Sequence, residues 1–150
     1  MKWVTRRHAR VNRIATAWLI RRFIDPAAEL LFVAAEDVAG VQREQGAKGF
    51  DAPGAAYPHQ DAQGRCSFEA LVDEHCPDDR ALQALARIVH CADFPDAPQT
   101  EPVAAGLRAI SRDFPLVEKD DHAALARASF LYDALYASLR ENGPSGDPRR

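Results

Sequence analysis

The sequence predicts a single α+β domain that is mainly helical, with four or five helices and two or three short strands. Two observations lead to this fold class. Apolar residues recur at helical spacing in several stretches, and short apolar runs of strand length lie between them. The chain has 150 residues, which suits one domain with one core, and its composition is ordinary for a globular protein. We place the domain at residues 3–141 and expect the tail, 142–150, to be disordered.

The chain is expected to begin with a strand and a central helix. Residues 2–7 alternate in hydrophobicity, which predicts a short strand. Asn12 is the expected N-cap of a helix over about 13–24, and the Asp25-Pro26 pair ends it. This helix is apolar around much of its circumference, so it should be central to the core.

The middle of the chain mixes strands, turns and a helix. Residues 29–33, ELLFV, predict a buried strand, and residues 36–45 predict a short polar helix. Residues 49–59 are punctuated by Gly and Pro and predict either a strand–turn–strand unit or a loop. Ser67 is the expected cap of a helix over about 68–76.

The C-terminal half is predicted to be helical. The acidic PDD sequence at 77–79 opens a helix that runs to about Cys91, and the proline-rich residues 92–100 form a connection. A helix follows over about 101–112. The last one runs from about 120 to 141 and starts with two aspartates, which suit a helix N-terminus.

Several classes of protein are disfavoured by the composition. No apolar run approaches the roughly 20 residues of a membrane span, and no signal peptide is visible, so we expect a cytoplasmic protein without membrane contact. The cysteines are Cys66, Cys76 and Cys91. An odd number without a CxxC pair argues against a disulfide framework or a structural zinc knuckle.

The positive charge is gathered at the N-terminal end. The first 25 residues carry a net charge of +6, although the whole chain carries −3. Guanidinium groups offer a planar fork of donors that matches oxyanions, so this end predicts an anion site. The expected ligand-binding residues are Arg6, Arg7, His8, Arg10, Arg13, Arg21 and Arg65. The alternative is that the arginines only solvate the ends of a buried helix or pair with the acidic remainder.

Helical spacing predicts a basic stripe within this end. At about 100° per residue, Arg10, Ala17 and Arg21 fall on nearly one line, with Arg13 close to it, provided that the helix begins early enough to include Arg10. The small side chain in the middle of the stripe would leave room for a ligand.

A second set of residues has the chemistry of metal ligands. The scattered candidates are Asp51, His59, Glu69, His90 and Asp93, with Asp121 and His122 farther along the chain. We expect His59, Glu69, His90 and Asp93 to hold one divalent ion, and such mixed ligands suit Zn, Mn or Fe. The alternative is local: Glu69 and His90 favour the two ends of their helices, and His59 is an exposed loop residue.

Cys66 has two interpretations. It lies near the predicted start of a helix and beside Arg65, where a thiol can have a lowered pKa and take part in redox chemistry. Alternatively it is a buried and unreactive core residue.

The chain resembles the C-terminal domain of the chromate-resistance protein ChrB family over nearly all of residues 3–140. The segments that carry the resemblance are RRHARVNRIATAWLIRRFIDPAAELLFV, FDAPGA, HQDAQGRCSFEALV, LARIVHCAD and the DDH…LYDALYA helix. The matching positions are Arg6, Arg7, His8, Arg10, Arg13, Trp18, His59, Arg65, Cys66, Phe68 and Glu69, with a looser match at His90 and Asp93. The resemblance implies a role in chromate resistance, usually alongside a chromate efflux transporter. Many members carry a winged-helix-like regulatory domain ahead of this module, and we expect a stand-alone copy without it.

Three functions are compatible with these observations. The first is a module that binds or senses chromate or a related small oxyanion through an Arg/His-rich site, with or without a bound metal. The second is a metal-dependent enzyme that reduces chromate or hydrolyses an anionic substrate. The third is a regulatory protein-interaction module without catalysis. We do not expect nucleic acid as a partner of this domain, because the remainder is acidic and no helix-turn-helix is evident, and a homo-oligomer stays open.

Overall fold

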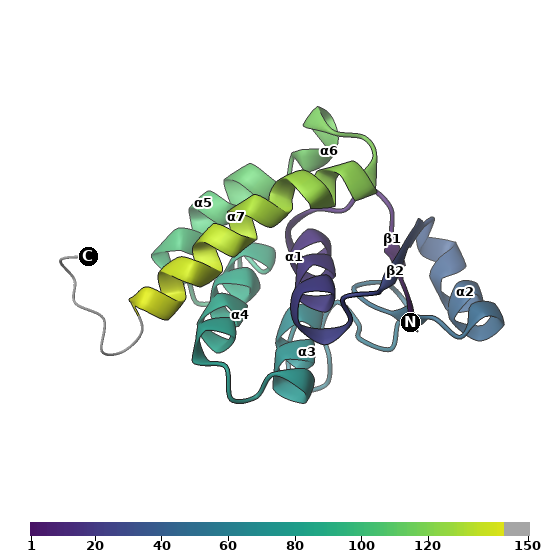
Figure 1. Ribbon diagram of the computed structural model, residues 1–150, viewed down its shortest axis with the longest axis horizontal. Coiled ribbons are helices and arrows are strands. Elements are labelled where there is room, and N and C mark those ends of the chain that lie inside the picture. The colour runs from purple at the N-terminus through teal and green to yellow at the C-terminus, as the bar shows by residue number, and fades with distance from the viewer. Residues whose placement is uncertain (143–150) are drawn as a thin grey trace.

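A computed structural model of the chain describes residues 1–142 and has a small sheet beside a larger helical body (Figure 1). This architecture confirms the predicted fold class, a mainly helical α+β domain. The predicted disordered tail lies, except for Asn142, outside the described residues.

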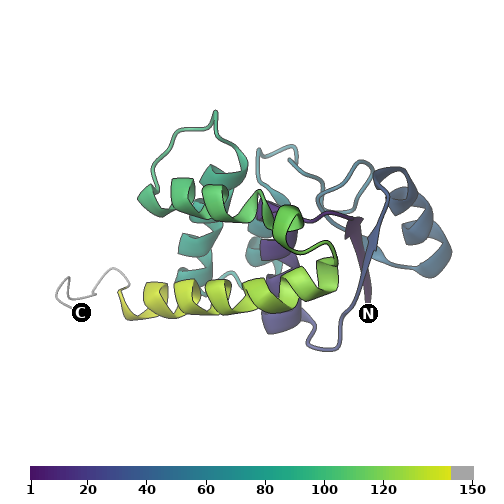
Figure 2. The ribbon, with the colours of Figure 1, turned by 90° about the horizontal axis from the view of Figure 1, so that it is seen from above.

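The sheet has three parallel strands in the order β2-β1-β3. Strand β1 spans Lys2–Arg6, β2 spans Glu29–Val33 and β3 spans Lys48–Gly49. Because side chains alternate along a strand, Trp3 packs into the main core, whereas Val4 packs against Val38 of α2. Helix α2, Val38–Gln45, therefore covers one face of the sheet, and the helical body covers the other (Figures 1 and 2).

Helix α1, Val11–Leu19, is the centre of the core, as its apolar circumference predicts. Its start differs from the prediction, because Arg10 is the N-cap and Asn12 lies buried inside the first turn. The Asn12 side chain donates a hydrogen bond to Ser67 Oγ at 3.0 Å, and it accepts one from Thr16 Oγ1 at 2.9 Å. Asn12 thus bonds other buried side chains and is not free to cap the helix.

The end of the central helix is also irregular. The segment Ile20–Ile24 winds as a π-helix directly after α1, before the chain turns at Asp25. A π turn holds more residues than an α turn, so the side chains beyond Leu19 point in directions that a regular α-helix would not give.

The remaining helices largely follow the predicted ranges. They are α3 (Ser67–His75), α4 (Arg80–Asp93), α5 (Pro102–Ser111) and α7 (Asp121–Glu141), and a 3₁₀ turn at Ala35–Asp37 precedes α2. The cap of α3 is Cys66, not Ser67 as predicted. Helix α4 extends beyond the predicted end at Cys91, and a short helix α6, Phe114–Val117, was not predicted. In the ambiguous stretch 49–59, a single bridge pairs Phe50 with Tyr57, so most of it is loop.

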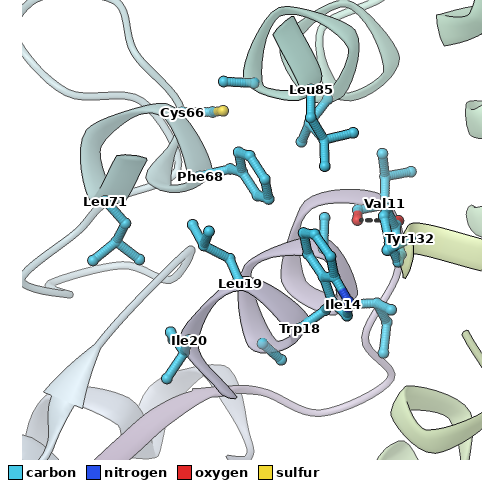
Figure 3. Packing of buried hydrophobic residues seen from close by; sticks show 14 of the residues in the cluster. Val11, Ile14, Trp18, Leu19, Ile20, Cys66, Phe68, Leu71, Leu85 and Tyr132 are labelled. Atoms are coloured by element: carbon cyan, nitrogen blue, oxygen red, sulfur yellow. Dashed lines mark hydrogen bonds between the residues drawn. The ribbon is translucent and has the colours of Figure 1, made fainter. Parts of the chain in front are cut away.

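The core forms where α3, α4 and α7 pack around α1. Figure 3 shows Ile14 and Trp18 of α1 facing Tyr132, while Leu19 lies near Phe68. The Tyr132 hydroxyl is buried and donates a hydrogen bond to the backbone oxygen of Val11 at 3.4 Å. Among the described residues, no helix combines the length and the apolar character that crossing a bilayer requires.

Candidate functional site

Two clusters of potential metal ligands lie near the C-terminal end of α4. In the Asp51 cluster, ligand atoms of Asp51, His59 and Asp93 lie within 4.8 Å of one another. In the Cys66 cluster, those of Cys66, Glu69 and His90 do the same. The four residues predicted to hold one ion are thereby divided between two clusters.

Asp51 is the fixed centre of its cluster. It follows β3 in the left-handed backbone region, with φ of 47°, which is uncommon for a residue other than glycine. Arg6 Nε donates to the Asp51 backbone oxygen at 2.8 Å. The guanidinium groups of Arg6 and Arg13 approach Oδ2 of the Asp51 carboxylate at 3.6 and 3.5 Å. Such uncommon backbone conformations concentrate at functional sites, where the surroundings hold them in place.

His59 joins Asp51 to Asp93. Its Nδ1 lies 2.7 Å from Asp51 Oδ1 and 3.5 Å from Asp93 Oδ2. The hydrogen bond to Asp51 raises the pKa of His59, and burial opposes this effect. The imidazole comes from the loop after Asp51 and is 49% exposed, so the cluster opens to solvent on this side.

Asp93 is the member of the cluster whose carboxylate lacks hydrogen-bond donors among the described residues. Its side chain is only 14% exposed, yet within residues 1–142 its Oδ2 accepts no hydrogen bond. Burial, together with the nearby negative charge of Asp51, raises the pKa of Asp93 to about 6. Arg13 is similar, because its buried Nε also has no partner in the described chain, and burial lowers its pKa. This corner of the domain therefore holds buried charge that its own hydrogen bonds do not fully compensate.

The Cys66 cluster, by contrast, is a helix cap. Glu69 accepts a hydrogen bond from the Cys66 backbone N–H at 3.1 Å, and the Cys66 side chain accepts one from the backbone N–H of Glu69. The same Glu69 oxygen contacts His90 Nδ1. Burial, with the charge of Glu69 adding to it, raises the pKa of the Cys66 thiol well above its usual value. The expectation that Cys66 is buried is confirmed, and the raised pKa disfavours the thiolate that the redox interpretation requires.

Phe94 adjoins both clusters. Its ring centroid lies 4.8 Å from that of His59 and 4.8 Å from that of His90. Asp51 was among the scattered candidates but not in the predicted ligand set, and Cys66 was considered only for redox chemistry. The sequence spacing around these two residues does not indicate their roles, because the residues they contact in the clusters come from separate elements.

The predicted arginine site is divided by the structure. Arg6 and Arg13 are bound to Asp51, whereas Arg7, His8 and Arg10 are exposed. For those three, the side chains form no hydrogen bond or ion pair within the described residues. The backbone N–H groups of His8 and Ala9 donate to the carboxylate of Asp121 at 3.0 and 2.7 Å, so this loop already binds one anionic group.

Two of the predicted arginines lie in other surroundings. Arg65 is bound to Asp61 and Asp73, at 2.9 and 2.8 Å. Arg21 lies in the π segment, in a small hollow beside Leu125 of α7. Ala17 is completely buried, so the prediction that its small side chain leaves room for a ligand in the basic stripe is wrong. His122, a scattered metal candidate, packs its ring edge-on against Phe32 at 5.0 Å.

A third feature is the exposure of large apolar side chains on α5, α6 and α7. They are Val103, Ile110, Leu116, Val117 and Phe130, and the last is 81% exposed. Ile110 also lines the hollows between these helices, together with Phe114 and Leu131. Large exposed apolar patches occur where proteins interact.

Comparison with known proteins identifies the family. The family model described as "ChrB, C-terminal domain" matches residues 3–139. The chain belongs to the ChrB C-terminal domain family. Protein ChrB of Cupriavidus metallidurans is 38% identical over 136 residues, which are 90% of this chain and 40% of that protein. This ChrB domain therefore spans about two-fifths of that relative's length. No solved structure matches the chain.

Proposed function

We propose that this ChrB domain acts in chromate resistance by binding a tetrahedral oxyanion, chromate or a related dianion. The proposed site, which we call the cationic rim, comprises exposed Arg7 and Arg10 together with His59 and the partly exposed Arg6. Membership of the ChrB family supports the role in chromate resistance. The oxyanion and its residues are supported by the charge distribution alone.

The observation that carries this proposal is the positive charge of Arg7 and Arg10, unpaired in the described part of the chain and lying in the same segment that supplies Arg6 and Arg13 to Asp51. Arg6 and Arg13 neutralise the Asp51 carboxylate, and Arg10 lies close enough to Arg13 to influence its pKa. Arg7 and Arg10 have no acidic partner among residues 1–142. Guanidinium groups without an internal carboxylate are available to a tetrahedral anion, and each charged hydrogen bond is worth about 1.5–3 kcal/mol.

The test is equilibrium dialysis of the full chain against chromate, in buffer that contains a chelator so that no metal takes part. Replacing both Arg7 and Arg10 by alanine should weaken binding by at least about 10-fold, because two charged donors are lost. Arg127→Ala is the matched control, since Arg127 is exposed and pairs with Glu118 elsewhere on the molecule. Sulfate should compete, because it has the same charge and shape. Unchanged binding by the double variant, or no binding by the wild type, would refute the proposal.

The exposed apolar side chains of α5, α6 and α7 favour a second candidate function, a protein-interaction module whose partner is another copy of the chain. Phe130 of α7 is 81% exposed. Sedimentation velocity over a range of protein concentrations should show a dimer for the wild type and a monomer for Phe130→Glu. A wild-type chain that stays monomeric at all concentrations would argue against this candidate.

A further inference from the structure

We propose that Asp51, His59 and Asp93 form a binding site for one divalent first-row transition-metal ion. This inference does not rest on oxyanion binding at the cationic rim. It rests on the positions of three ligand atoms, on a buried carboxylate oxygen without a partner, and on the contrast with the Cys66 cluster.

The spacing of the three ligand atoms fits a single ion. Bonds from Zn²⁺ to histidine nitrogen and carboxylate oxygen are about 2.0–2.2 Å, so neighbouring ligand atoms lie roughly 2.8–3.6 Å apart. In the Asp51 cluster, His59 Nδ1 lies 2.7 Å from Asp51 Oδ1 and 3.5 Å from Asp93 Oδ2. The ligand atoms of Asp51 and Asp93 lie within 4.8 Å of each other, so an ion in place of the proton at Nδ1 would have to draw the two carboxylates together where their separation exceeds this range of ligand spacings.

The hydrogen bonds around the cluster leave one buried carboxylate oxygen without a donor in the described chain, although cationic side chains lie nearby. Both arginines approach the same oxygen of Asp51, Oδ2, and Oδ1 is left to face His59. The charges of Arg13 and Arg108 act on Asp93, but its one direct contact with a charged group in the described chain is the 3.5 Å approach of His59, and its buried Oδ2 accepts no hydrogen bond there. A buried carboxylate normally has a hydrogen-bond donor, a cation or a metal beside it. A divalent ion between Asp51 and Asp93 would supply that partner.

The three ligands are held by separate parts of the fold before any ion binds. Asp51 is fixed by its backbone contacts with Arg6 and Tyr57, and Asp93 is the last residue of α4. His59 is half exposed, so an ion can enter from solvent on that side. Three protein ligands leave coordination positions open, and the two oxygens and one nitrogen suit Mn²⁺, Fe²⁺ or Zn²⁺.

The Cys66 cluster lacks these features, although it contains the softer ligands. Glu69 uses one oxygen for both the Cys66 N–H and His90, and the Cys66 side chain accepts a backbone N–H. An ion there would have to displace the hydrogen bonds that cap α3. The structure therefore assigns the metal to the Asp51 cluster and a capping role to the Cys66 cluster.

The experiment is isothermal titration calorimetry of Mn²⁺, and separately Zn²⁺, into the full chain after treatment with a chelator and its removal. The wild type should bind about one ion per chain. Asp93→Asn and His59→Ala should each lower the affinity at least about 10-fold, because each removes one of three ligands. Glu69→Gln is the matched control and should keep the wild-type affinity. Circular dichroism should show that each variant is folded. Because His59 is half exposed, His59→Ala should disturb the packing less than Asp93→Asn.

Three results would overturn the assignment. They are no binding by the wild type, wild-type affinity in both Asp93→Asn and His59→Ala, or an equal loss of affinity in Glu69→Gln. Because the dialysis with chromate is done in chelator, failure of the metal site leaves that result unchanged. Failure of the cationic rim likewise leaves the metal titration unchanged.

Discussion

The Asp51 cluster and the Cys66 cluster are neighbours with similar residue types but different states of hydrogen bonding. Each contains a histidine and at least one carboxylate, and each histidine packs against Phe94. In the Cys66 cluster, every interaction of Glu69 serves the start of α3 or holds His90. In the Asp51 cluster, Asp93 is buried without a hydrogen bond to Oδ2. Residue types that can ligate a metal therefore do not define a metal site by themselves. Buried polar groups that lack hydrogen-bond partners are the better indicator of one.

The largest effect expected from this difference is stabilisation by metal. A ligand that binds only the folded state, at 100 times its dissociation constant, adds about 2.7 kcal/mol to the free energy of unfolding. For a chain of this size, that should raise the melting temperature by several degrees. Differential scanning calorimetry with and without Mn²⁺ measures it. The rise should disappear on adding chelator and fall to about half or less in Asp93→Asn, where a 10-fold weaker affinity leaves at most about 1.4 kcal/mol, but persist in Glu69→Gln.

A rise of equal size in Asp93→Asn would place the ion elsewhere. A rise that is lost in Glu69→Gln would reverse the roles of the two clusters.

The second effect, smaller and of opposite sign, is the loss of the α3 cap. Glu69→Ala removes the hydrogen bond to the Cys66 N–H and the contact with His90, so the free energy of unfolding should fall by about 1–2 kcal/mol. Urea unfolding measures the loss, which should be the same in chelator and in metal. Glu44→Ala, on the exposed surface of α2, is the control and should change stability by less than about 0.5 kcal/mol. No loss in Glu69→Ala would remove the structural explanation of the Cys66 cluster.

The helices and strands could be predicted from the sequence because their signals are local. The alternation in 2–7, the apolar run 29–33 and the acidic start of the last helix lie within a few residues of the structures they specify. The errors have nonlocal causes. Asn12 looks like a helix cap, but it bonds Ser67, 55 residues away, inside the core. The π segment after Leu19 likewise could not be foreseen from a 3.6-residue period.

The candidate site was predictable only in its residue types. His59, Glu69, His90 and Asp93 were selected because they are metal-ligand types, and the structure places all four in the two clusters. Their division between clusters depends on how α3, α4 and the loop after β3 pack, which no spacing encodes. Asp51 owes its central position to an uncommon φ and to two arginines from the N-terminal segment. The arginine stripe was misleading because periodicity does not reveal that Ala17 is completely covered by neighbouring helices.

The smallest expected effect is a gain in stability when Asp93 is neutralised in the absence of metal. Burial and the charge of Asp51 raise the pKa of Asp93 to about 6, above the value near 3.9 of an unfolded chain. The folded state then binds more protons than the unfolded state between about pH 4 and pH 6, so ionised Asp93 destabilises the fold above this range. In chelator at pH 7.5, Asp93→Asn should raise the free energy of unfolding by about 1 kcal/mol, less than the roughly 3 kcal/mol that this pKa difference represents, because the buried amide of asparagine also lacks a partner.

The pH dependence of that gain separates it from a general change in packing. At pH 4.5, wild-type Asp93 is largely protonated in the folded state, so the gain should shrink toward zero. Urea unfolding of both chains at the two pH values gives the difference directly, and other titrating groups cancel between wild type and variant. A loss of stability in Asp93→Asn at pH 7.5 would mean that the Asp93 carboxylate is well compensated without a metal. The contrast between the two clusters would then no longer favour an ion at Asp51.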